Sequence, residues 1–247
     1  MRLDVFFGTP LNQADVAGRV VAVVDVLRAS TTIAAALHNG ARAIVPLESP
    51  DEVVNRLKSF AREDVLLAGE RKMLPISGFD LGNSPREMVP ERVEGKTLLF
   101  TTTNGTATLA AISGARDVVI ASYVNFTAVL TMLRAALRGG TDIAVVCAGT
   151  DRQFSLEDAA CAGRYVHHVT KRLANVELND AAVAASLIDR RYGDSLRKLF
   201  DATAHGRALA AAGFEEDLGV CASIDAFGVI PIYQDRQITK LGPERER

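Results

Sequence analysis

The chain has 247 residues and a net charge of −2, because 28 Lys and Arg residues nearly balance 30 Asp and Glu residues. Its length suits one large α/β domain or two small ones that fold without disulfides, and its charge argues against polybasic binding of nucleic acid or membranes. The three cysteines form no C-x-x-C pair, and the apolar runs are far shorter than the roughly 20 residues of a membrane span. We therefore expect a cytoplasmic globular protein with no nucleic-acid or membrane partner.

Short β-branched runs alternate with Ala- and Leu-rich stretches of helical length along most of the chain. Several runs lack polar alternation, as expected of strands that are covered on both faces. Helices are expected to begin after Ser49, Ser84 and Ser155, each of which opens a capping sequence. The pattern predicts a three-layer α/β/α fold with a largely parallel or mixed sheet. The predicted strands are 3–7, 20–26, 43–47, 65–68, 97–101, 118–121, 143–147 and 229–233.

From about residue 155 the pattern becomes mostly helical, with helices expected over 179–192 and 194–204. No Ser/Gly-rich linker separates this region from the rest, so we expect one unit spanning residues 1–247. An alternative within this interpretation divides the unit into two lobes, about 1–150 and 151–242, around a cleft. The tail 243–247, Pro-Glu-Arg-Glu-Arg, is predicted to be disordered.

The first polar loop follows the apolar run near residue 24 and contains Asp25, Arg28 and the hydroxyl residues Ser30, Thr31 and Thr32. In open α/β sheets ligands bind beyond the carboxyl ends of the strands, so polar residues placed there are candidates for function. The free amides and positive end of the helix that follows suit a phosphate group. In the alternative interpretation Ser30 only caps the helix, and Asp25 pairs with Arg28.

A second polar segment, expected to be a long loop, spans residues 69–85. Loops of this length are usually functional or disordered. Glu70 and Arg71 place opposite charges just past a strand, and Asn83 and Ser84 end the segment. The alternative for Asn83 and Ser84 is that they only cap the next helix.

The third loop, Thr102, Thr103, Asn104, Gly105 and Thr106, is small, polar and contains glycine. An Asn-Gly pair is more often a hairpin turn. Because a helix is expected to follow here, the sequence favours a turn that binds an oxyanion.

In the fourth loop, Glu157 and Asp158 lie in the first turn of the helix that begins after Ser155. Acidic residues there usually answer the helix dipole, but beside a phosphate they could also hold a divalent cation. The loop by itself leaves both interpretations open. His205, beside Gly206, is a minor further candidate. The chain lacks the G-x-x-x-x-G-K-[ST] and G-x-G-x-x-G motifs, which argues against a P-loop NTPase and a dinucleotide-binding protein.

Four strings, in this order, resemble the 2-phosphosulfolactate phosphatase (ComB-like) family: VDVLRASTTI, GER with GFDLGNSP, TTNGT, and CAG…FSLED…AG. The resemblance implies an α/β/α fold with its site in a cleft. It also implies a Mg²⁺-dependent hydrolase that removes phosphate from 2-phospho-3-sulfolactate, a step towards coenzyme M. The residues at the motif positions are Asp25, Arg28, Ser30, Thr31, Glu70, Arg71, Asn83, Thr103, Asn104, Glu157 and Asp158.

We assign expected roles to these residues from the chemistry of such an anionic substrate. Mg²⁺ prefers oxygen ligands, and we expect Asp25 and Glu70 to hold it first, with Glu157 and Asp158 next. The expected catalytic residues are Asp25, Arg28, Glu70, Arg71 and Asn104. The expected phosphate-binding residues are Ser30, Thr31, Thr32, Asn83, Ser84, Thr102, Thr103, Gly105 and Thr106.

Two mechanistic alternatives and two functional alternatives stay open. A bound water attacks phosphorus, or Asp25 itself does so and forms a phosphoenzyme. A non-catalytic sensor of phosphorylated or sulfonated metabolites would keep the cationic residues but would have no use for Glu70, Glu157 and Asp158, because carboxylates repel an anionic ligand. The substrate could also be another 2-phospho hydroxy acid, and a homo-oligomer remains compatible with the sequence.

Overall fold

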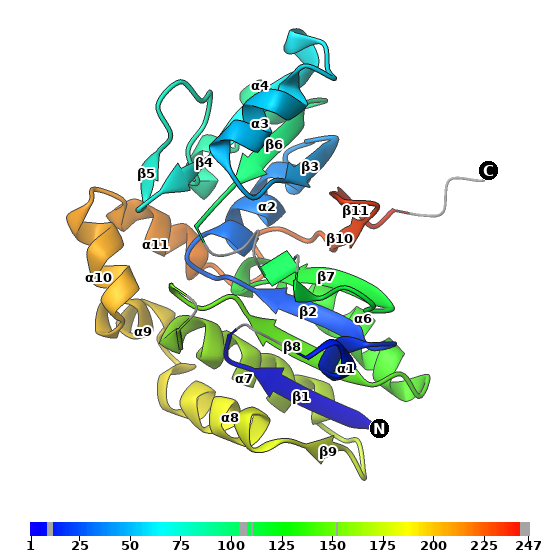
Figure 1. Ribbon diagram of the computed structural model, residues 1–247. Helices are drawn as coiled ribbons and strands as arrows, with labels where there is room; N and C mark the ends of the chain where they lie inside the picture. Colours follow the sequence, from blue (N-terminus) through cyan, green and yellow to red (C-terminus); the bar gives the residue numbers. More distant parts are fainter. Residues whose placement is uncertain (9–11, 104–107, 110, 152, 243–247) are drawn as a thin grey trace.

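The computed structural model describes residues 1–8, 12–103, 108–109, 111–151 and 153–242 (Figure 1). Within these residues one mixed sheet of eleven strands has the order β5-β4-β6-β3-β11-β10-β7-β2-β8-β1-β9. The strands are β1 (Arg2–Phe6), β2 (Val20–Val24), β3 (Ala43–Pro46), β4 (Val65–Arg71), β5 (Leu74–Pro75), β6 (Thr97–Thr101), β7 (Asp117–Ala121), β8 (Ile143–Cys147), β9 (Glu177–Leu178), β10 (Pro231–Gln234) and β11 (Gln237–Lys240).

The sheet contains two groups of parallel strands joined by a hairpin. In the first group β2 lies between β7 and β8 and is parallel to both, and β1 extends this group beyond β8. In the second group β6 lies between β3 and β4. The hairpin β10–β11 pairs antiparallel with β7 on one side and with β3 on the other. The chain therefore passes from the first group of strands to the second between β2 and β3. In open α/β sheets, ligands bind at such a topological switch point, where the strand order changes direction.

Helices cover both faces of the sheet, as the sequence predicted. Because successive strand residues point to opposite faces, β2 contributes to two cores. Val20, Ala22 and Val24 pack in a core with buried residues of the helices α6, α7 and α8. Val21 and Val23 pack in a second core with α2. Both faces of this strand are therefore buried, which explains its continuous apolar sequence and confirms the three-layer α/β/α arrangement.

The helices differ widely in length, and short 3-10 turns stand between some of them. The α-helices are α1 (Gln13–Val16), α2 (Ala29–His38), α3 (Pro50–Leu57), α4 (Pro90–Val93), α6 (Phe126–Arg138), α7 (Leu156–Thr170), α8 (Asp180–Tyr192), α9 (Leu196–Ala202), α10 (Ala204–Ala211) and α11 (Glu215–Cys221), and the 3-10 turns are η1 (Arg62–Asp64), η2 (Pro85–Glu87) and η3 (Tyr123–Asn125). Figure 1 shows α9, α10 and α11 beside the carboxyl ends of β2 and β8. None of the described helices combines the length and the apolar composition needed to cross a bilayer.

All eight predicted strands are present, β6 and β8 with the predicted ends and the other six with shifted ends. The strand predicted over 20–26 ends at Val24, and β5, β9 and β11 were not predicted. The segment 69–85 is not simply a loop, because β4 continues through Arg71 and pairs with β5. Lys72 and Met73, both with positive φ, form the turn between these two strands.

Two predicted helices are wrong in detail. Ser84 opens only the 3-10 turn η2, because Pro90 disfavours helical conformation at the residue before it and Val89 is extended. The helix predicted over 194–204 is two helices, because Thr203 is extended and its hydroxyl caps α10 by accepting a hydrogen bond from Gly206 N–H at 2.9 Å. The caps at Ser49 and Ser155 are confirmed. The division into two lobes stays a prediction, and the tail 243–247 lies outside the described residues.

Candidate active site

Residues that follow four strands meet at one edge of the sheet. Asp158, in the first turn of α7 after β8, accepts a 2.8 Å hydrogen bond from Val26 N–H, just past β2. Glu70, near the end of β4, accepts hydrogen bonds from the amide and hydroxyl of Thr103, past β6, at 2.8 and 2.9 Å. Asp25 is the first residue after β2. The carboxyl ends of β2, β4, β6 and β8 therefore bring together four of the residues singled out in the sequence.

Asp25 is a buried carboxylate among other charged groups. It is only 8% exposed, and one side-chain oxygen accepts a hydrogen bond from Ala29 N–H at 3.3 Å. Burial raises the pKa of Asp25 to about 6, and the negative charges of Glu70 and Glu157 add to this effect. The positive charge of His205 opposes it. Asp25 can therefore exchange a proton near neutral pH, which suits a general acid or base.

Glu157 and Asp158 have different partners although they are adjacent. Glu157 Oε1 lies 3.3 Å from His205 Nδ1. Burial by itself would lower the pKa of His205, but the hydrogen bond and the charge of Glu157 raise it above its usual value. The two oxygens of Asp158 accept hydrogen bonds from the backbone amides of Val26 and Gly149, and burial raises the pKa of Asp158 well above its usual value. Asp158 thus ties two loops together, whereas Glu157 orients the imidazole.

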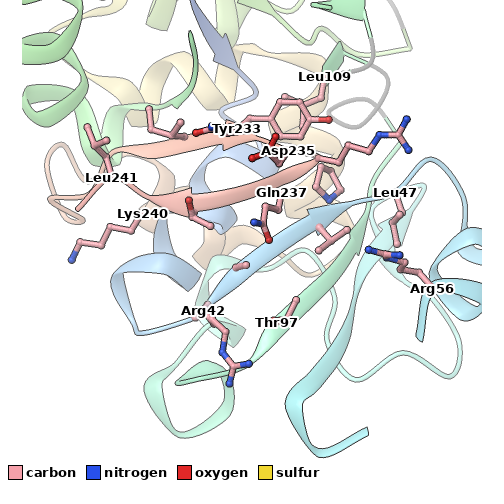
Figure 2. Close-up of a pocket in the computed structure, with 18 of the residues that line it drawn as sticks. Arg42, Leu47, Arg56, Thr97, Leu109, Tyr233, Asp235, Gln237, Lys240 and Leu241 are labelled. Atoms are coloured by element: carbon pink, nitrogen blue, oxygen red, sulfur yellow. The ribbon is translucent and has the colours of Figure 1, made fainter. Parts of the chain in front are cut away.

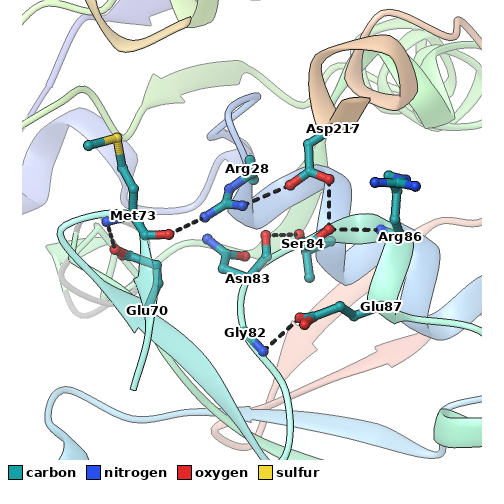
Figure 3. A network of polar contacts seen from close by, with 10 residues as sticks. Arg28, Glu70, Met73, Gly82, Asn83, Ser84, Arg86, Glu87 and Asp217 are labelled. Atoms are coloured by element: carbon teal, nitrogen blue, oxygen red, sulfur yellow. Dashed lines mark hydrogen bonds and ion pairs between the residues drawn. The ribbon is translucent and has the colours of Figure 1, made fainter. Parts of the chain in front are cut away.

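Arg28 is a buried cross-link rather than a free loop side chain, and it is 3% exposed. The structure pairs it with Asp217, at 2.8 Å between Nη1 and Oδ2, and not with Asp25 (Figure 3). Its Nη2 donates to the carbonyl oxygen of Met73 at 2.8 Å. Its guanidinium carbon lies 4.2 Å from the centre of the Phe214 ring. Two separate parts of the chain, the turn after β4 and the start of α11, therefore hold this one side chain.

Glu70 and Arg71 face opposite sides of β4, because neighbouring strand residues do so. Glu70 accepts a third hydrogen bond, from Met73 N–H at 2.7 Å, which fixes the turn after β4. Arg71 instead donates to the carbonyl oxygen of Glu48 at 3.2 Å and to the Thr101 hydroxyl at 3.0 Å. The structure therefore brings Glu70, but not the Arg71 side chain, to the contacts that surround Asp25.

The hydroxyl groups at the start of α2 already have protein partners. Ser30 Oγ accepts from the Asp25 amide at 2.9 Å. Thr31 donates to a carbonyl of the preceding turn at 2.9 Å, and Thr32 donates to the Asn83 carbonyl at 3.0 Å. The Ser30 amide donates to the Asp25 carbonyl at 2.8 Å, and the amide before it donates to the Asp25 side chain. Much of the hydrogen-bonding capacity expected to bind an anion is thus used by Asp25 and the packing of α2.

The remaining predicted phosphate-binding residues lie around this centre. Ser84 donates its hydroxyl to Asp217 at 2.7 Å, and Thr102 is buried. Asn83 is also buried, and its side-chain oxygen has no hydrogen-bond partner within the part of the chain that the structure describes. The predictions for Asn104, Gly105 and Thr106 lie outside the described residues.

A cavity of about 20 Å³ lies beneath the first turn of α2, with Asp25, Ser30 and Thr102 in its otherwise apolar lining. A much larger open pocket, about 1650 Å³, lies elsewhere, over β3, β10 and β11 (Figure 2). Its lining includes Arg42 and Tyr233 but none of the carboxylates that meet at the sheet edge. Pocket size and the gathering of ionisable groups therefore point to different places, and the candidate active site is the one with the gathered ionisable groups.

The expected Mg²⁺ ligands do not form a ready-made cage. Among the described residues, no group of three or more His, Cys, Asp or Glu side chains is placed to hold a metal ion. Glu70 and Asp158 use their oxygens to accept backbone hydrogen bonds. Asp25 and Glu157 are buried carboxylates of like charge, and Mg²⁺ needs only one or two carboxylates beside water and phosphate oxygens. The donor chemistry therefore fits Mg²⁺ held by these two residues together with substrate oxygens.

The sequence interpretation assigned no role to Asp217 or Phe214, and it gave His205 only a minor place. His205 and Asp217 lie on α10 and α11, far along the chain from the residues that they contact. The one local signal was Gly206, where a Cβ would lie 2.1 Å from the Phe200 carbonyl oxygen. The glycine in the first turn of α10 thus allows a close backbone approach beside His205.

Comparisons with known proteins agree with the resemblance in the sequence. The 2-phosphosulpholactate phosphatase family matches residues 8–236 of this chain. A probable 2-phosphosulfolactate phosphatase of Symbiobacterium thermophilum is 41% identical over 227 residues, which cover 92% of this chain and 96% of the relative. Similarly named proteins of Caldanaerobacter subterraneus and Thermotoga maritima are each 38% identical, over 90% and 86% of this chain and 90% and 88% of the relatives. The chain therefore belongs to the 2-phosphosulpholactate phosphatase family, a family of phosphoric monoester hydrolases.

Proposed function

We propose that this protein hydrolyses 2-phospho-3-sulfolactate to 3-sulfolactate and phosphate with Mg²⁺, a step of the coenzyme M biosynthesis type. The observation that carries the proposal is the meeting of Asp25, Glu157 and His205 at the carboxyl ends of β2 and β8. The names of the relatives support the substrate. The buried carboxylates favour a hydrolase over a non-catalytic anion sensor. Carboxylates repel an anionic ligand, so a sensor would have no use for them, whereas a hydrolase can use them to hold a cation or to transfer a proton.

The described residues suggest a division of labour in the hydrolysis. Asp25, whose pKa is about 6 in the metal-free protein, is mostly ionised at neutral pH and accepts a hydrogen bond from the attacking water, which it orients towards phosphorus. His205, held by Glu157, carries positive charge towards the phosphate and donates a hydrogen bond to it. Bound Mg²⁺, held by Asp25 and Glu157, would stabilise the negative charge on the phosphoryl oxygens.

Phosphate release from a panel of 2-phospho acids tests the proposal. The panel contains 2-phospho-3-sulfolactate, 2-phospholactate and 2-phosphoglycerate, each assayed with Mg²⁺ and with excess EDTA. We expect the highest kcat/KM for the sulfonated compound, loss of activity in EDTA and recovery when Mg²⁺ is restored. Full activity in metal-stripped protein would contradict the metal requirement. A tenfold preference for another phospho acid would reassign the substrate and leave the phosphatase chemistry in place.

A further inference from the structure

The guanidinium of Arg28 is held more firmly than a loop arginine needs to be. Its Nη1 bonds Asp217 at 2.8 Å, and both side chains are 2% exposed. Its Nη2 donates to the Met73 carbonyl oxygen (Figure 3), and its central carbon lies 4.2 Å from the centre of the Phe214 ring. These two hydrogen bonds use one N–H on each terminal nitrogen, out of the five N–H donors that a guanidinium carries. The group is thus fixed in place with donor capacity beyond the bonds that hold it.

Asp217 is itself fixed from both sides. Its second carboxylate oxygen accepts a 2.7 Å hydrogen bond from the Ser84 hydroxyl. The preceding residue of α11, Glu216, forms an ion pair with Arg86 of η2. Asp217 therefore cannot turn away from Arg28 without breaking contacts between α11 and the segment 83–87.

Stability alone does not account for this arrangement. A buried ion pair is often no better for stability than two apolar side chains of similar volume, because both charges lose their hydration. Arg28 also stands three residues after Asp25, at the N-cap of α2, and the amide of the next residue, Ala29, donates to the Asp25 side chain at 3.3 Å. The fixed cation is therefore beside the groups to which we assign the hydrolysis.

We propose that Asp217 is a positioning residue, which fixes the guanidinium of Arg28 so that its remaining N–H donors bind an oxyanion of the substrate. This inference rests on the proposed function. A planar fork of donors binds a phosphate, carboxylate or sulfonate well only when its orientation is set, because each misplaced donor loses its hydrogen bond. The loss of conformational entropy on orienting the flexible arginine side chain then occurs during folding and not at each binding event.

The test compares Asp217→Asn with the wild-type protein. Asparagine keeps the shape of the side chain but removes the charge that holds Arg28. We measure the Kd of inorganic phosphate and of 3-sulfolactate separately by calorimetry, and we expect one of them to rise at least tenfold. The KM for 2-phospho-3-sulfolactate should rise by the same factor. The compound whose Kd rises shows which anionic group Arg28 contacts. We expect kcat to stay within threefold, because Arg28 binds the ground state and the transition state alike.

Asp189→Asn is the matched control, since Asp189 forms another partly buried ion pair, with Arg164 at 3.2 Å. It should lower the melting temperature without changing either Kd. If Asp217→Asn does not fold, Ser84→Ala replaces it, because it removes only the hydroxyl that orients Asp217. In this variant the Kd of phosphate or of 3-sulfolactate should rise two- to fivefold.

The proposal is wrong if folded Asp217→Asn binds both probes as tightly as the wild-type protein, or if Ser84→Ala does so when Asp217→Asn is unfolded. It is also wrong if the wild-type protein binds neither probe. A wild-type protein that binds phosphate but does not turn over 2-phospho-3-sulfolactate would refute the proposed substrate instead. In that case the comparison of the Kd values still decides the role of Asp217.

Discussion

Replacing Asp25 by asparagine should make the protein more stable and much less active. The carboxylate is 8% exposed and lies near the negative charges of Glu70 and Glu157. Its charged form is therefore disfavoured by folding. Asparagine keeps an oxygen that can accept the hydrogen bond from Ala29 and carries no charge, so it removes this unfavourable contribution.

The pKa of Asp25 sets the size of the effect and its pH dependence. A rise from 3.8 in the unfolded chain to about 6 in the folded protein corresponds to about 3 kcal/mol of lost stability once the group is ionised in both states. Well below pH 3.8 the carboxyl is protonated in both states, and the loss vanishes. The stability advantage of Asp25→Asn should therefore be small near pH 4 and grow to its full value above about pH 7. For a chain of this length about 3 kcal/mol corresponds to roughly 6–12 °C in melting temperature.

Thermal unfolding in EDTA between pH 4 and pH 8, together with single-turnover kinetics at pH 7.5 in Mg²⁺, measures both effects. Saturating Mg²⁺ should raise the melting temperature of the wild-type protein and close the gap to Asp25→Asn. Equal stabilisation of both proteins by Mg²⁺ would argue against Asp25 as a ligand. If Asp25→Asn is no more stable at pH 8, the electrostatic reasoning is wrong. A rate within about tenfold of wild type, or ~1.4 kcal/mol of barrier, would remove Asp25 from the catalytic residues.

Two further substitutions test the supports of the site. Arg28→Met should cost about 3–5 kcal/mol in urea unfolding, because it leaves the Asp217 charge buried without a charged partner. Adding Asp217→Leu should recover most of this stability without restoring phosphate affinity, and full recovery of affinity would mean that Arg28 is only structural. Gly206→Ala would place a Cβ 2.1 Å from the Phe200 carbonyl oxygen, so we expect about 1–3 kcal/mol of destabilisation and a lower kcat as His205 moves. A stable Gly206→Ala variant with wild-type kcat would contradict this account.

The sequence by itself determined the local elements of this protein and the edge where its polar loops gather. The continuous apolar run of β2 predicted a strand covered on both faces, and both cores are present. Ser49 and Ser155 predicted helix starts correctly because capping depends on residues only three positions apart. The rule that ligands bind beyond the carboxyl ends of strands placed Asp25, Glu70 and Glu157 in one region without knowledge of the sheet order.

Only the tertiary structure decided which side chains become partners. Arg28 and Asp217 are 189 positions apart, and no local pattern distinguishes Asp217 from the other acids at the start of α11. Glu157 meets His205 because the tertiary structure brings the first turn of α7 to the first turn of α10, which begins after the extended Thr203. Local sequence encodes the propensity of each segment, whereas the pairing of charges depends on how distant segments bury their apolar faces against one another. That burial, and not the spacing of the motifs, assembled the site.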